Sequence, residues 1–102
     1  FGISFHDLFR LGGTRARLIR SRPGRSVGLH SHHGEELTLV LTGGFTDETG
    51  HYVRGDLQTA DGALDHKPMA DAGEDCIVLA VCDAPLKFRN PAVALIGKLF
   101  GF

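Results

Sequence analysis

Residues 24–43 read GRSVGLHSHHGEELTLVLTG, and this stretch decides the fold. His30 and His32 are two residues apart, so on an extended backbone both imidazoles point to the same face. Neutral imidazole is a ligand suited to zinc, iron, nickel or copper. Glu36 has the same parity as the two histidines, although Gly34 between them permits a kink that weakens this argument. The stretch therefore predicts a metal site at the start of a strand.

The residues after Glu36 give a second reason to expect a cation. Residues 37–41 read LTLVL, which is apolar on both faces and predicts a buried strand. A carboxylate entering such a strand needs a compensating partner, and a metal ion is a natural one. A His-x-His pair alone more often marks a polar turn with exposed histidines, so the wider spacing has to decide between the two interpretations.

Outside this stretch, turn residues divide the chain into short runs of period two, and Gly, Pro and Asp clusters separate the runs. Many short strands at this spacing predict an all-β sandwich or barrel. The candidate strands are Arg15–Ser21, Ser26–His30, Leu37–Thr42, Gly44–Asp47, His51–Arg54, Asp56–Thr59, Leu64–Met69, Cys76–Val81 and Leu86–Arg89.

The end of the chain breaks the strand pattern. Asn90 can cap a helix and Pro91 fits its first turn, so we expect a short C-terminal helix over residues 91–100. Apolar residues would occupy nearly the whole circumference of this helix. We therefore expect it to pack on the barrel, on a second copy of the chain in a homodimer, or on a neighbouring domain.

Length and charge limit the function classes. The 102 residues suffice for one domain, with the barrel over residues 14–89. Eleven Lys and Arg nearly balance 12 Asp and Glu, which gives no reason to expect nucleic acid or an anionic membrane as partner. Arg15 and Arg17 alternate with Ala16 and Leu18, which we interpret as the solvated face of a strand rather than a nucleic-acid patch.

The two cysteines, Cys76 and Cys82, fall in one apolar run that we expect to be a single strand. Six steps along a strand put the sulfurs roughly 20 Å apart, and a disulfide tolerates a Cα separation of about 7 Å at most. With no disulfide framework, signal peptide or membrane span, we expect a cytoplasmic location. The chain does not begin with Met, and a fragment of a longer protein is one expectation.

The spacing from Gly24 to Gly43 resembles the first motif of the cupin superfamily at every fixed position. Five residues precede His30-x-His32, three separate it from Glu36, and six more lead to Gly43. A second cupin motif opens at Gly55-Asp56 and closes at His66. It is a weaker match, because Ala60 replaces the usual Pro and the interval to His66 is slightly longer than the common form.

A narrower resemblance, to the C-terminal cupin domain of ChrR-type anti-sigma factors, extends from about Ala16 to Phe88. It is carried by residues 30–41, Gly43, Phe45, residues 47–50, Tyr52, Gly55-Asp56, His66, Cys76 and residues 84–88. The resemblance implies a cupin barrel, that is, a jelly-roll or double-stranded β-helix.

The same resemblance implies one divalent metal ion, Zn²⁺ first with Fe²⁺, Ni²⁺ or Mn²⁺ as alternatives, held by His30, His32, Glu36 and His66. It also implies a sensor of oxidative damage, notably singlet oxygen, that influences release of a sigma factor. Proteins of this family bind their sigma factor through a separate N-terminal domain that contains a Cys-x-x-Cys motif. This chain has no Cys-x-x-Cys motif. The chain is thus either the isolated sensory half or a stand-alone relative.

Three functions remain open from sequence alone: a regulatory metal domain, a small metal-dependent enzyme such as a dioxygenase, and a binder of small molecules. A metal ion that is bound by four protein ligands in a closed shell has no coordination position left for substrate. A metal ion with open coordination positions would instead favour oxygen chemistry. The resemblance favours regulation without catalysis. Among other residues, we expect His6 and His51 on the surface, His33 beside the site or in solvent, and Cys76 as a buried structural thiol.

Overall fold

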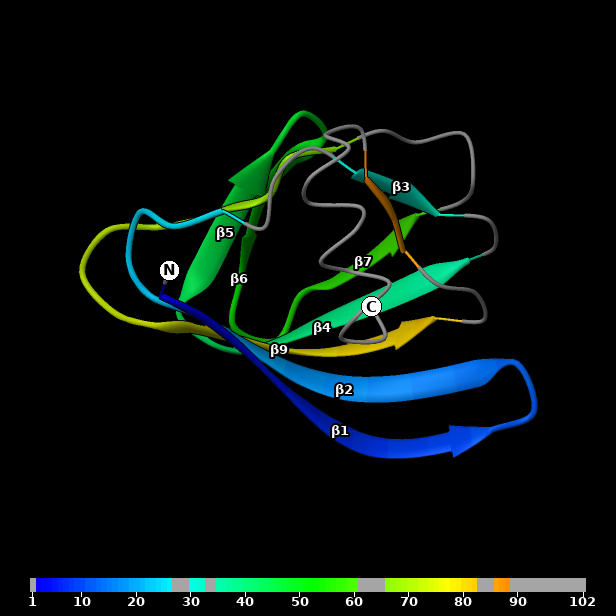
Figure 1. Cartoon of the computed structure of the whole chain (residues 1–102). Helices are drawn as coiled ribbons and strands as arrows, with labels where there is room; N and C mark the ends of the chain where they lie inside the picture. Colours follow the sequence, from blue (N-terminus) through cyan, green and yellow to red (C-terminus); the bar gives the residue numbers. More distant parts are fainter. Residues whose placement is uncertain (1, 27–29, 33–34, 61–65, 83–85, 89–102) are drawn as a thin grey trace.

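Strands make up all the regular structure in the part of the chain that the computed structural model describes, namely residues 2–26, 30–32, 35–60, 66–82 and 86–88 (Figure 1). The expected all-β fold is confirmed. In chain order the strands are β1 (Ile3–Leu11), β2 (Thr14–Ser21), β3 (His30–His32), β4 (Glu36–Thr42), β5 (Gly44–Asp47), β6 (Gly50–Val53), β7 (Leu57–Ala60), β8 (Met69–Ala70), β9 (Cys76–Cys82) and β10 (Leu86–Phe88).

The strands form three antiparallel sheets that enclose a common interior. The largest has the order β1-β2-β9-β4-β7, and the two smaller ones have the orders β6-β5-β8 and β10-β3. Figure 1 shows the five-stranded sheet below, with β3, β5 and β6 facing it from above. Side chains alternate along each strand, so one face of the five-stranded sheet lines this interior and the other faces outward.

The apolar core sits at one end of the interior. It consists of the buried side chains of Val40, Phe45, Ala70, Cys76 and Val78. The Phe45 ring is stacked on Tyr52 of the neighbouring strand β6, with ring centroids 5.1 Å apart. Aromatic side chains bury a large area each, so Phe45 makes the main contribution of the three-stranded sheet to the apolar core.

Gly43, the last fixed position of the first motif, is required by backbone geometry. Its φ is +67°, and a Cβ at this position would lie 2.3 Å from the carbonyl oxygen of Asp75. Only glycine adopts this conformation without strain and leaves room for the neighbouring chain. The chain can therefore cross at Gly43 from β4 in the large sheet to β5 in the small one.

The expectation that residues 37–41 are buried on both faces is wrong. Glu36, Thr38 and Val40 are buried, whereas Leu37 and Leu41 are each 41% exposed. The inward positions of β4 carry the polar residues at its start, and the leucines occupy the outward positions. The apolar run at residues 37–41 therefore forms a strand whose outward face is partly exposed to solvent.

The interpretation of Arg15 and Arg17 as solvated residues is also wrong. They are 7% and 2% exposed and share the inward face of β2 with Ile19. The guanidinium of Arg17 lies 4.7 Å from the centre of the Phe5 ring. Burial, followed by the neighbouring Arg15, lowers the pKa of Arg17 to about 10, so it stays charged at neutral pH.

Strand β1 was not among the expected strands, yet it pairs with β2 along its whole length. Most other predicted boundaries are close to the observed ones, but in place of the strand predicted at Leu64–Met69 the described residues show β8 at Met69–Ala70. Ser26 forms an isolated bridge with Met69, and the strand predicted around it is observed only from His30. The predicted C-terminal helix lies outside the described residues. No helix in the described part of the chain is long and apolar enough to cross a membrane.

We expect Phe45→Ala to lower the free energy of unfolding by about 3–5 kcal/mol, because it removes a buried aromatic side chain and leaves a cavity. Urea unfolding followed by circular dichroism measures the change. Met69→Ala is the matched control, since Met69 pairs with the same strand but is 45% exposed; it should change the value by less than about 0.5 kcal/mol. Equal effects of the two variants would contradict the placement of the core.

Candidate metal centre

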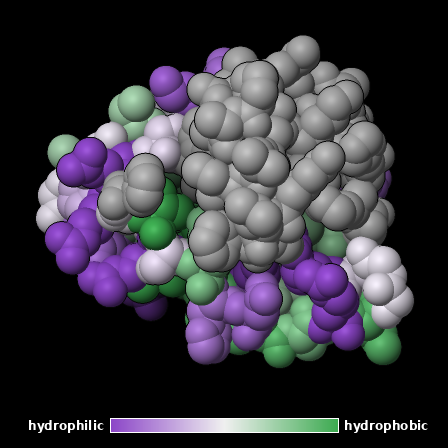
Figure 2. All heavy atoms as spheres, viewed as in Figure 1, coloured by the Kyte–Doolittle hydropathy of each residue, from purple (hydrophilic) through white to green (hydrophobic). Residues whose placement is uncertain are grey.

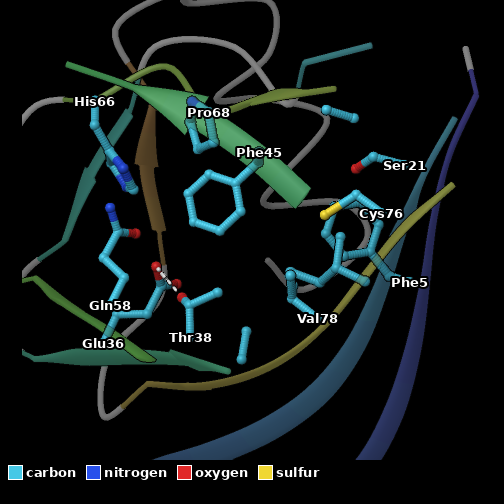
Figure 3. A pocket seen from close by; sticks show the side chains of 13 residues that line it. Phe5, Ser21, Glu36, Thr38, Phe45, Gln58, His66, Pro68, Cys76 and Val78 are labelled. Atoms are coloured by element: carbon cyan, nitrogen blue, oxygen red, sulfur yellow. Dashed lines mark hydrogen bonds between the residues drawn. The ribbon is translucent and has the colours of Figure 1, made fainter. Parts of the chain in front are cut away.

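A cavity of about 60 Å³ lies inside the barrel, with polar groups at one end and apolar groups at the other. Figure 3 shows His66, Gln58, Glu36 and Thr38 on one side and Cys76, Val78 and Phe5 on the other, with Phe45 between them. The two candidate ligands whose side chains are described, Glu36 and His66, thus share the polar end.

His66 is held in position by Asp47. The imidazole is 1% exposed, and its Nδ1 lies 2.9 Å from Oδ2 of Asp47, whose side chain is fully enclosed. Burial alone would raise the pKa of Asp47, but hydrogen bonds from His66, Thr49 and Gln58 outweigh it and lower the pKa to about 2. Asp47 is therefore ionised at neutral pH and accepts the hydrogen bond.

This hydrogen bond fixes the tautomer of His66. When Nδ1–H donates to the Asp47 carboxylate, the neutral ring carries its lone pair on Nε2. Metal-binding histidines in proteins nearly always donate their other ring nitrogen to a carboxylate, a carbonyl or water in this way. The contact between Asp47 and His66 is thus of the kind that accompanies metal-binding histidines.

Gln58 and Thr49 complete the environment of Asp47. The side-chain amide of Gln58 donates to Oδ2 of Asp47 at 2.6 Å and to the hydroxyl of Thr49 at 3.2 Å. The backbone N–H and the hydroxyl of Thr49 donate to Oδ1 of Asp47 at 2.8 and 2.7 Å. No role for Asp47 or Gln58 was predicted from the sequence. Asp47 stood out only as one of residues 47–50, which belong to the family resemblance.

Glu36 is a buried carboxylate at the first position of β4. It is 5% exposed, and the hydroxyl of Thr38 donates to its Oε1 at 3.3 Å. Burial raises the pKa of Glu36, against the effects of His66, the Thr38 hydrogen bond and Arg17. A bound cation would stabilise the ionised form of such a carboxylate. The chemistry of Glu36 and His66 therefore fits a divalent metal ion.

The remaining two candidate ligands, His30 and His32, form the ends of β3. This strand pairs with β10, in the register His30 with Phe88 and His32 with Leu86. The two histidines have the same parity on an extended strand, as the sequence predicted, but their side chains lie outside the described part of the structure. Across residues 2–26, 35–60 and 66–82, no three His, Cys, Asp or Glu side chains gather to hold a metal ion.

His6, His51 and Cys76 lie away from the polar end, whereas Cys82 on β9 pairs with Glu36 on β4. His6 and His51 are exposed, as expected, and His51 pairs with Asp71 on the surface. Both cysteines are buried and free, as expected. Burial, with a smaller effect from Asp71, raises the pKa of Cys76 to about 11. Cys76 therefore belongs to the apolar core, and His33 lies outside the described residues.

Comparison with known proteins identifies the relatives of the chain. A family model described as the ChrR cupin-like domain matches residues 2–86. The anti-sigma-E factor ChrR of Cereibacter sphaeroides is 46% identical over 89 residues, which is 87% of this chain and 42% of that protein. This chain thus spans less than half the length of that curated relative.

Solved structures agree with this match. One is described as Rhodobacter sphaeroides SigE in complex with the anti-sigma ChrR; it matches with a TM-score of 0.75 and 45% identity, over 78% of this chain and 43% of the other. An RmlC-like cupin protein from Ralstonia eutropha has a TM-score of 0.72 at 16% identity, over 88% of this chain and 60% of the other. The second likeness shows the fold alone, and together the two confirm the cupin fold.

We expect Cys76 to react slowly with a thiol reagent in the folded protein. A pKa near 11 leaves about one thiol in a thousand ionised at pH 8, against about a quarter for an exposed cysteine. In a Cys82→Ala background, modification by a disulfide reagent should be at least about 100-fold slower in the folded than in the urea-unfolded protein. Similar rates in the two states would contradict the placement of Cys76 in the core.

Proposed function

Since this chain belongs to the family of ChrR cupin-like domains, we propose that it is a single metal-binding domain that regulates transcription as part of an anti-sigma factor. The chain spans 42% of its ChrR relative, and we assign sigma-factor binding to a separate N-terminal domain of the longer protein. The role of the cupin domain is then to alter that contact in response to an oxidative signal such as singlet oxygen.

The domain is proposed to hold one Zn²⁺ through His30, His32, Glu36 and His66. The observation that carries this assignment is the hydrogen bond from Nδ1 of His66 to the enclosed carboxylate of Asp47, the contact that metal-binding histidines make through their other ring nitrogen. The buried carboxylate of Glu36 at the same end of the cavity supports it. When bound, zinc supplies a redox-inert cross-link among three imidazoles and one carboxylate.

The proposed ligand set and one observation, the cavity volume, favour regulation over catalysis. A zinc ion with four protein ligands has no position left for substrate or water. The cavity that Glu36 and His66 line is about 60 Å³, whereas pockets for small-molecule ligands usually measure about 300–1,000 Å³. A small metal-dependent dioxygenase is the alternative function, and it would require open positions on a redox-active metal.

The proposed signal acts on the ligands and not on the core thiols. The buried Cys76 thiol, with its raised pKa, is a poor target for oxidants that attack the thiolate. Oxidation of a ligand imidazole would remove one of the residues that link β3 and β4 with the segment at His66. Because the ligands come from separate segments, loss of one would loosen several strands together.

We expect a chelator to lower the melting temperature of the purified domain, because a metal that binds only the folded state stabilises it. His66→Ala should abolish this sensitivity. His51→Ala is the matched control, since His51 is also paired with an aspartate but lies on the surface; it should keep the sensitivity. Protein that holds iron and consumes oxygen with a diketone would instead support the enzyme.

We expect Asp47→Asn to weaken zinc binding about 10–100-fold, because the carboxylate that orients His66 is lost. Asp71→Asn, which removes the carboxylate paired with His51, should leave the affinity unchanged. Competition with a chromophoric chelator measures both values. An unchanged affinity in Asp47→Asn would contradict the assignment of His66 as a ligand.

A further inference from the structure

The arginines near the start of the chain divide between two parts of the molecule. Six arginines lie between positions 10 and 25, and two of them are buried inside the barrel. Three others, Arg20, Arg22 and Arg25, line a surface cavity of about 480 Å³, which we call the arginine groove. The groove lies at the end of β2 that is remote from the polar end of the barrel. In Figure 2 hydrophilic side chains gather at the left of the molecule, on the side where Figure 1 places the start of β1.

Backbone hydrogen bonds hold one wall of the groove in place. Arg22 and Arg25 are the first and last residues of a turn, which is closed by a 3.0 Å hydrogen bond from the N–H of Arg25 to the carbonyl of Arg22. The central residues are Pro23 and Gly24, and Gly24 has the positive φ, +76°, that a type II turn requires at this position. The N–H of Arg22 also donates to the carbonyl of Gly2 at 2.8 Å. Both arginines therefore extend from anchored backbone positions.

Glycine at position 2 leaves room for the side chain of Arg25. The φ of Gly2 is +81°, and a Cβ at this position would lie 2.9 Å from Cγ and 3.4 Å from Nε of Arg25. The side chain of Arg25 therefore lies across the backbone at the start of β1. Ile3 and Ser4, the next two residues of that strand, complete the lining of the groove.

The groove has an excess of positive charge. Arg20 donates from Nε and Nη2 to Oδ2 of Asp75, at 2.7 and 2.6 Å. Among the described residues, neither Arg22 nor Arg25 has an ion-pair partner, and no carboxylate lines the groove. Three guanidinium groups and the one carboxylate of Asp75 leave a net charge of +2. A concave site with charge of one sign raises the local concentration of ligands of the opposite sign.

We propose that the arginine groove binds the phosphate monoester group of a small molecule. Such a group has a charge of about −1.5 to −2 at pH 7, which matches the excess charge of the groove. A planar guanidinium donates two parallel hydrogen bonds to phosphate oxygens, a geometry that favours arginine at phosphate sites. The volume of about 480 Å³ falls within the range of about 300–1,000 Å³ that is typical of small-molecule sites. The groove therefore has room for the group that carries the phosphate.

A nucleic-acid strand fits the groove less well than a compact ligand. Proteins bind nucleic acid through basic patches or stripes that follow its phosphates, and these phosphates carry one charge each. The groove concentrates three arginines in one cavity, and the chain as a whole has 11 Lys and Arg against 12 Asp and Glu. The proposal is also independent of the metal assignment, because the groove shares no lining residue with the cavity inside the barrel.

NMR of the 102-residue chain, recorded through the Nε–H groups of arginine, tests the proposal with inorganic phosphate and adenosine monophosphate as probes. We expect both probes to shift the signals of Arg22 and Arg25 until saturation, with a dissociation constant of about 1 mM or below at low salt. Arg22→Gln and Arg25→Gln, made singly, should each weaken binding at least about 10-fold, because each removes charge-assisted hydrogen bonds. Circular dichroism shows whether each variant folds.

Arg54→Gln is the matched control. Arg54 is exposed in the turn after β6 and does not line the groove, so its variant loses the same charge but should keep the affinity. Equal weakening in Arg54→Gln would overturn the proposal, because binding would then depend on net charge alone. Signals of Arg22 and Arg25 that do not move at about 10 mM of either probe, ten times the expected constant, would also overturn it. A short oligothymidylate that binds more tightly than adenosine monophosphate would assign the groove to nucleic acid instead.

Discussion

The enclosed carboxylate of Asp47 joins three segments that are far apart in the sequence. Its two oxygens accept hydrogen bonds from Thr49 in the following turn, from Gln58 on β7 and from His66 ahead of β8. Gln58 and His66 are buried, so removing the acceptor would leave these two groups unsatisfied at once, at roughly 1–3 kcal/mol each. Because Asp47 is ionised, the same contact also determines which nitrogen of the neutral His66 ring carries the proton.

The inward face of the five-stranded sheet changes from polar to apolar along its strands. On β4 the inward side chains run from Glu36 through Thr38 to Val40, and on β2 they run from Arg15 to Ile19. Buried charges are costly unless they compensate one another, and this arrangement keeps them together at one end. The other end can then pack as an ordinary apolar core. A divalent ion at the polar end would bind where the carboxylate already is.

The sequence predicted most of the fold and half of the described candidate site, for physical reasons that differ by residue. Period-two alternation located the strands, but β1 was missed because a bulge between Asp7 and Phe9 shifts its parity midway. Motif spacing pointed to Glu36 and His66, which line the same end of the cavity, and their role as metal ligands stays a prediction. No local pattern pointed to Asp47, since its hydrogen bond to His66 spans 19 positions. Alternation also cannot say whether an apolar face is covered, so the exposure of Leu37 emerged only from the three-dimensional structure.

We propose that three imidazoles and one carboxylate hold a metal ion at the polar end of this barrel. X-ray absorption spectroscopy of protein purified without added metal tests it most directly, because the buried thiols Cys76 and Cys82 offer the main competing ligand type. Zinc bound only by nitrogen and oxygen, at about 2.0–2.2 Å and four-coordinate, is the predicted result. A sulfur shell at about 2.3 Å would contradict the ligand set, and protein that holds no stoichiometric metal would contradict the site itself.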